Sequence, residues 1–128
     1  MPGALNWNDV RELGRRVLEE GESLPLTEEV RTILRRTARE VAIDADEAEQ
    51  ALRTVPEATA LLREMTRRIR DGSHRLSYTL AQMYRLRDAG DLEGARQQMR
   101  EVLAVEVVPH YRDIAETSLE ALDAPESD

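Results

Sequence analysis

Residues 86–93 read Leu-Arg-Asp-Ala-Gly-Asp-Leu-Glu, a helix end followed at once by a helix start. Gly90 can take the left-handed backbone conformation that ends a helix, and Asp91 can accept a backbone N–H that begins the next one. Apolar residues keep helical spacing on both sides of this turn: Leu62, Met65, Ile69, Leu76, Leu80, Met83 and Leu86 before it, and Leu92, Met99, Leu103, Val107, Ile114 and Leu122 after it. The pattern predicts two long helices, about 56–88 and 92–121, folded back as an antiparallel hairpin.

Two residues interrupt the predicted arms. Gly72 lies inside the first arm, where glycine costs about 1 kcal/mol relative to alanine. The apolar spacing passes from Ile69 to Leu76 in phase, so we expect that helix to continue through Gly72. Pro109 removes one hydrogen bond from the second arm and should kink it near residues 105–109.

The residues before the hairpin predict three shorter helices. Thr27 can cap the second of them, and Asp44 with Glu47 can form a capping box for the third. Their expected ranges are about 8–20, 28–42 and 45–53. Each carries an apolar stripe that needs a neighbour to bury it, and the hairpin offers that neighbour.

These elements predict an all-α fold, a helical bundle built on a long antiparallel helical hairpin. Only 3% of the residues are aromatic and the apolar ones are mainly aliphatic, which suits helix packing. We expect one helical domain over residues 1–128. In it, three short helices of 1–54 pack on the two-helix hairpin of 55–122, and an acidic tail follows at 123–128.

Composition and charge exclude several functional classes. The chain has no cysteine, so disulfides and thiolate chemistry are excluded. Neither a signal peptide nor a membrane-spanning apolar run is recognisable, and we expect a cytoplasmic protein without membrane contact. All 18 basic residues are arginines, yet the net charge is -8, which argues against nucleic-acid binding. A helix-turn-helix over 34–52 is also disfavoured, because its second helix begins Asp44-Ala45-Asp46-Glu47 and would bring carboxylates against DNA phosphate.

A metal or acid–base site is one candidate. The two histidines are His74 and His110. A hairpin that turns at Gly90 would bring His74, Glu106 and His110 near one another. However, His74 lies off the apolar stripe and is expected to face solvent. The three residues define the alternative of a metal-dependent enzyme, and we favour exposed histidines.

Two arginine stripes are the other candidates. Arg31, Arg35 and Arg39 share one face of the second helix, and Arg63, Arg67 and Arg70 share one face of the fourth. The guanidinium group forms forked contacts with carboxylates and phosphates. The competing interpretation is a solvated face with helical ion pairs such as Glu64 with Arg68. We favour the solvated face for the stripes as such, and the six arginines are our candidates for contact with a protein partner.

Four stretches resemble the DUSAM-domain paralogous family of myxobacteria. They are Leu13-Gly14-Arg15-Arg16-Val17-Leu18-Glu19-Glu20-Gly21-Glu22, Val55-Pro56-Glu57-Ala58-Thr59-Ala60-Leu61-Leu62, Leu86-Arg87-Asp88-Ala89-Gly90-Asp91-Leu92-Glu93-Gly94-Ala95-Arg96 and Val105-Glu106-Val107-Val108-Pro109-His110-Tyr111. The resemblance spans about residues 7–122. It implies a paralogous origin in a family of unknown function, and no functional residues follow from it.

The sequence favours a non-catalytic, helical protein-binding or regulatory module over an enzyme. We expect no cofactor. The partner is predicted to be a protein of unknown identity, and a homodimer is possible if the long helices leave an apolar strip exposed. The alternative in the binding class is an acidic immunity-type protein that neutralises a toxic effector.

Overall fold

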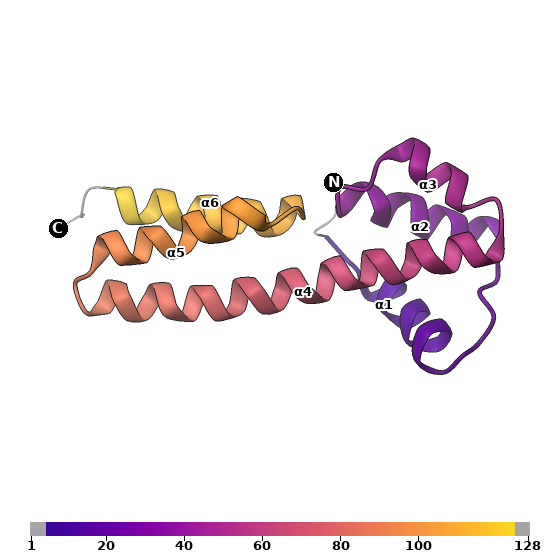
Figure 1. The fold of residues 1–128 in the computed structure, drawn as a ribbon, viewed down its shortest axis with the longest axis horizontal. Helices are drawn as coiled ribbons and strands as arrows, with labels where there is room; N and C mark the ends of the chain where they lie inside the picture. Colours follow the sequence, from indigo (N-terminus) through magenta and orange to yellow (C-terminus); the bar gives the residue numbers. More distant parts are fainter. Residues whose placement is uncertain (1–4, 125–128) are drawn as a thin grey trace. The chain divides into compact units, whose positions relative to one another are not determined.

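The computed structural model describes residues 5–124, and all regular structure within them is helical. This confirms the predicted all-α class. The elements are α1 (Asn8–Gly14), the π-helical turn η1 (Arg15–Glu19), α2 (Glu28–Glu40), α3 (Ala45–Ala51), α4 (Val55–Asp88), α5 (Leu92–Val105) and α6 (Pro109–Asp123) (Figure 1). Among the residues described, no helix combines the length and apolar character needed to cross a membrane.

The chain divides into two compact units, residues 1–69 and residues 70–128. The boundary falls inside α4, so this helix contributes residues to both units. We had expected the organisation to change at residues 54–55. The structure places the change 15 residues further along, after Ile69.

The turn after α4 has the predicted chemistry. Gly90 has φ 86°, the left-handed conformation expected of a helix-ending glycine. The Asp91 carboxylate accepts a hydrogen bond from the Gly94 backbone N–H at 2.9 Å. α4 is also continuous through Gly72, as the apolar spacing indicated. The glycine–aspartate corner and the long helix before it are therefore confirmed.

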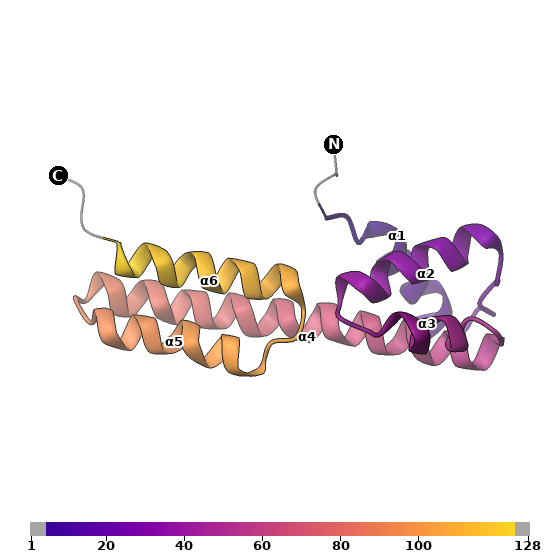
Figure 2. The ribbon, with the colours of Figure 1, turned by 90° about the horizontal axis from the view of Figure 1, so that it is seen from above.

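The second arm is not one kinked helix. Residues 106–108 are non-helical, and α6 runs back beside α5 and the later part of α4 (Figure 2). The prediction of a single second arm over 92–121 was wrong, because α5 and α6 share that range; the antiparallel hairpin itself, with α5 folded back on the later part of α4 at Gly90, is as predicted. The second unit contains three antiparallel helical segments, and its buried apolar residues are Leu76, Met83, Ala95, Met99, Val102, Val108, Tyr111, Ala115 and Leu122.

The break between α5 and α6 has a chemical cause that lies on both sides of Pro109. A residue before proline is driven towards extended backbone, and Val108 has φ -77° and ψ 116°. Pro109 then begins α6, where its missing N–H costs little. The Glu106 carboxylate accepts hydrogen bonds from the backbone N–H groups of Val107 and Val108 at 3.1 and 3.0 Å. Arg112 satisfies carbonyls at the end of α5.

In the first unit, α1, α2, α3 and the beginning of α4 enclose a core that includes Trp7, Val10, Leu13, Leu34, Val41, Leu52, Leu62 and Met65. Two helix starts use the predicted caps. The Thr27 hydroxyl accepts from the Val30 N–H at 3.2 Å, and Asp44 accepts from the N–H groups of residues 46 and 47. The helix predicted at 8–20 is α1 followed by a π-helical turn, which the apolar spacing did not indicate.

The corner between α2 and α3 is held from α4. Ala42 adopts a left-handed conformation with φ 64°, and the Ile43 N–H reaches back to the Ala38 carbonyl at 2.8 Å. Arg68 on α4 donates to the carbonyls of Val41 and Ala42 at 2.9 and 3.2 Å. The same guanidinium pairs with Glu64 at 2.7 Å, which confirms the predicted helical pair. These hydrogen bonds to backbone carbonyls therefore hold α3 beside α2.

One buried hydroxyl in this unit is a weak point. Thr37 is fully buried in α2, and its Oγ1 has no hydrogen-bond partner among the described residues. Replacing Thr37 with valine removes the unsatisfied hydroxyl and keeps the branched shape. We expect Thr37→Val to stabilise the protein by about 1 kcal/mol in urea denaturation. Thr37→Ser, which keeps the hydroxyl and loses the methyl group, should destabilise it; a destabilising valine would contradict the prediction.

Candidate functional site

The arginine stripe of α2 lies along the seam between α2 and α3. Two adjoining hollows of about 210 and 320 Å³ follow this seam. Arg35 and Glu49 line both of them, Arg39 lines the first, and Arg31 and Arg53 line the second. We call the pair of hollows the α2–α3 groove. All three arginines predicted on α2 therefore border one groove.

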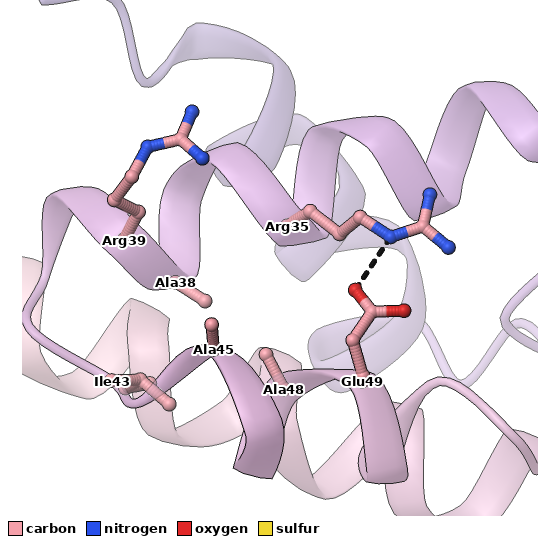
Figure 3. A pocket seen from close by; sticks show the side chains of 7 residues that line it. All are labelled: Arg35, Ala38, Arg39, Ile43, Ala45, Ala48 and Glu49. Atoms are coloured by element: carbon pink, nitrogen blue, oxygen red, sulfur yellow. Dashed lines mark hydrogen bonds and ion pairs between the residues drawn. The ribbon is translucent and has the colours of Figure 1, made fainter.

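The floor of the groove is apolar. Ala38, Ala45 and Ala48 point towards one another between the two helices, with Ile43 at one end (Figure 3). Ala38 and Ala48 are buried to 1% and 2% exposure. Because alanine is the smallest of the apolar core residues, this seam stays hollow where larger side chains would fill it.

The walls of the groove carry an excess of positive charge. Arg35 Nε donates to Glu49 Oε2 at 2.7 Å, and this hydrogen bond raises the pKa of the Arg35 guanidinium. Arg31 pairs with Glu28 at 3.2 Å. The side chains of Arg39 and Arg53 are exposed and make no hydrogen bond or ion pair with any other described residue. Four guanidinium groups thus face one lining carboxylate.

The arginines of the second predicted stripe are divided between the two units, and two of them pair with carboxylates. Arg63 is exposed, Arg67 pairs with Glu64 at 2.7 Å, and Arg70 pairs with Asp71 at 3.3 Å. The hydrogen bond from Arg67 lowers the pKa of Glu64. Arg63 and Arg67 belong to the first unit and Arg70 to the second. Their role in binding stays a prediction.

The metal-site alternative is not supported by the positions of its three residues. His74 and His110 are both exposed, whereas Glu106 is 3% exposed and bonds to Arg75 at 2.8 Å and to two backbone N–H groups. In residues 5–124 no group of three or more histidine, aspartate or glutamate side chains could hold a metal ion. Glu106 does lie opposite the α4 residues around His74, since it bonds to Arg75 and lies against Gly72, but the His74 side chain is exposed.

Sequence reasoning missed half of the groove. Glu49, Leu52 and Arg53 have the spacing of one helical face, so the residues that α3 and its end contribute could have been grouped. Helical spacing alone does not indicate which face of α2 this group would meet. That pairing depends on the Ala42 corner and on Arg68, a residue 26 positions further along the chain.

The fold and the groove define the class of protein: an all-α protein with a concave, arginine-lined surface. Among known families, the one described as "Protein of unknown function (DUF2379)" matches residues 5–122. The chain belongs to this family. No curated protein and no solved structure matches it. The narrower resemblance to DUSAM-domain paralogues of myxobacteria stays a prediction.

Proposed function

We propose that this protein is a non-catalytic protein-binding module and that the α2–α3 groove is its binding surface. The observation that carries the proposal is the groove itself: the three arginines predicted to bind on α2 line its two adjoining hollows, the first of which has an apolar floor. Protein interfaces are enriched in arginine and have apolar centres with polar rims. The groove has this distribution on a small scale.

The chemistry of the lining favours binding over catalysis. Guanidinium groups stay protonated and act only as donors, so they do not serve as general bases. The one lining carboxylate is engaged by Arg35. The two hollows also lie at or below the lower end of the volumes that enclose small-molecule ligands, about 300–1,000 Å³. A shallow surface of this size suits a segment of another protein.

Reversing one unpaired groove charge tests the proposal. Arg39 has no side-chain partner among the residues that the structure describes, so Arg39→Glu should leave the fold intact while it weakens capture of the native partner by about tenfold. The measurement is affinity capture from native extract with quantitative mass spectrometry, with folding checked by circular dichroism. The supporting result is a protein that the unaltered chain captures and that Arg39→Glu loses.

Two further variants sharpen this experiment. Arg85→Glu, an exposed position on α4 in the second unit, is the matched control and should retain the captured protein. Arg63→Glu tests the α4 stripe separately. Equal capture by the Arg39 and Arg85 variants would contradict the proposal. The captured protein also distinguishes a regulatory partner from a toxic effector, the alternative suggested by the net charge of -8.

A further inference from the structure

We propose that the groove receives an acidic, helical segment of the partner, and that Glu49 occupies the Arg35 position until that segment arrives. This inference rests on the proposed function and deepens it. In the free protein, Glu49 stands in for a carboxylate of the partner. On binding, Arg35 exchanges Glu49 for the partner carboxylate, and an apolar side chain of the segment enters the hollow above Ala38, Ala45 and Ala48.

The geometry of Arg35 supports the exchange. Only its Nε is used by Glu49, and the two Nη groups make no hydrogen bond with another described residue. Figure 3 shows these Nη groups turned away from the glutamate. A guanidinium offers five N–H donors and is best matched by a carboxylate that accepts two of them. Glu49 thus accepts from only one of the N–H donors of Arg35, so a partner carboxylate that accepts from two of them makes a stronger contact.

Because the Arg35–Glu49 ion pair is exposed, breaking it costs little free energy. The side chains of Arg35 and Glu49 are 41% and 53% exposed. Ion pairs at such positions contribute little to stability because water screens them and the side chains lose freedom. The α2–α3 corner does not depend on this pair, since Arg68 holds it through the carbonyls of residues 41 and 42. Glu49 can move away without loss of the groove.

Spacing and charge define the occupant. Arg35 and Arg39 are four residues apart on α2, about 6 Å along the helix axis. Carboxylates at positions i and i+4 of a second helix have the same rise, so an acidic helix can meet both guanidinium groups. Arg53, whose side chain also has no partner within residues 5–124, adds a positive charge at the other side of the groove. An apolar residue between the carboxylates would face the alanine floor.

A second copy of this chain is a weaker choice of occupant. A third hollow of about 290 Å³, on the side of α3 that faces α4, is lined by Glu47, Glu57 and Glu64 and would offer carboxylates. A contact between that hollow and the arginine groove of another copy joins two different surfaces. Such contacts propagate unless they close a ring. We therefore commit to a segment of a different protein.

The test is an NMR titration with a defined probe. The probe is a helical peptide of about 16 residues, long enough to hold some helix in water, with glutamates four apart and leucine between them. The control peptide carries glutamine in place of each glutamate. We expect amide resonances of α2 and α3 to move with the acidic peptide and to stay in place with the control peptide.

The Glu49→Gln variant separates this inference from a purely structural role. Removing the internal competitor should tighten binding of the acidic peptide about threefold, the size expected for an exposed ion pair. Arg39→Gln should weaken binding by a similar factor. In an Arg35→Gln background, Glu49→Gln should no longer tighten it, because the two residues act as a pair. Circular dichroism should show that all variants remain folded.

Several results would overturn the inference. They are equal or weaker binding by Glu49→Gln, equal binding of the glutamine peptide, shifts outside α2 and α3, or no shift at millimolar peptide. Association of the protein with itself through this groove, seen as concentration-dependent broadening without peptide, would also overturn it. The proposed function would survive any of these results if capture of the native partner still depends on Arg39.

Discussion

Replacing Glu106 with alanine is expected to destabilise the protein by about 3 kcal/mol, the lower end of the cost of breaking a buried ion pair. Glu106 is 3% exposed, and its Oε1 accepts from Arg75 Nη1 at 2.8 Å. Its Oε2 accepts from the N–H groups of Val107 and Val108. Alanine leaves those two backbone donors and the guanidinium without their acceptor. We choose the lower end because Arg75 is 38% exposed and can turn to water.

Urea denaturation followed by circular dichroism measures this cost. Glu106→Gln should be intermediate, because its amide oxygen can serve either Arg75 or the backbone donors, while its NH2 group faces the others. Glu101→Ala, at an exposed position on α5, is the matched control and should stay within about 0.5 kcal/mol. A loss below about 1 kcal/mol for Glu106→Ala would show that the α5–α6 corner does not depend on the carboxylate.

Replacing Gly72 with alanine should destabilise the protein by about 2 kcal/mol, within the usual range for overpacking. At an open helical position the same change would stabilise by about 1 kcal/mol. Here an added Cβ would lie 2.5 and 2.6 Å from Cδ2 and Cε2 of Tyr111, and 2.9 Å from Glu106 Oε1. The tyrosine ring rests directly on the glycine, so steric overlap outweighs helix propensity.

The Tyr111 ring provides the internal check on Gly72. Tyr111→Leu removes the ring edge that the new methyl group would meet. In the Tyr111→Leu background, Gly72→Ala should therefore cost much less than it does alone, a coupling between contacting residues that a double-mutant cycle measures. Ser77→Ala, on the exposed side of α4, controls for propensity and should be neutral or slightly stabilising. A stabilising Gly72→Ala would contradict the close contact.

Local chemistry made much of the fold predictable. The Gly90–Asp91 corner and the caps at Thr27 and Asp44 each depend on residues close in sequence. The separation of α5 from α6 was not predicted, because Pro109 by itself is compatible with either a kink or a break. Glu106 stabilises the break. From the sequence we weighed this residue only as a metal ligand, and its stabilising partner Arg75 lies 31 residues earlier.

The candidate site was predictable to the same extent. Helical spacing placed Arg31, Arg35 and Arg39 on one face of α2, and the structure puts all three along the groove. The opposing wall depends on contacts between elements, which a single helical pattern does not encode. The contrast between the two stripes shows this: Arg63, Arg67 and Arg70 have the same kind of spacing on α4, yet they fall into two compact units.

The aromatic residues give each unit its own optical signal. Trp7, the single tryptophan, is 6% exposed in the first unit, and its indole N–H donates to Glu40 at 3.1 Å. All three tyrosines, Tyr78, Tyr84 and Tyr111, belong to the second unit. Indole fluorescence therefore follows the half of the chain that carries the groove, and tyrosine absorbance follows the half that contains Glu106 and Gly72. Melting of either half can be recorded on the unlabelled protein.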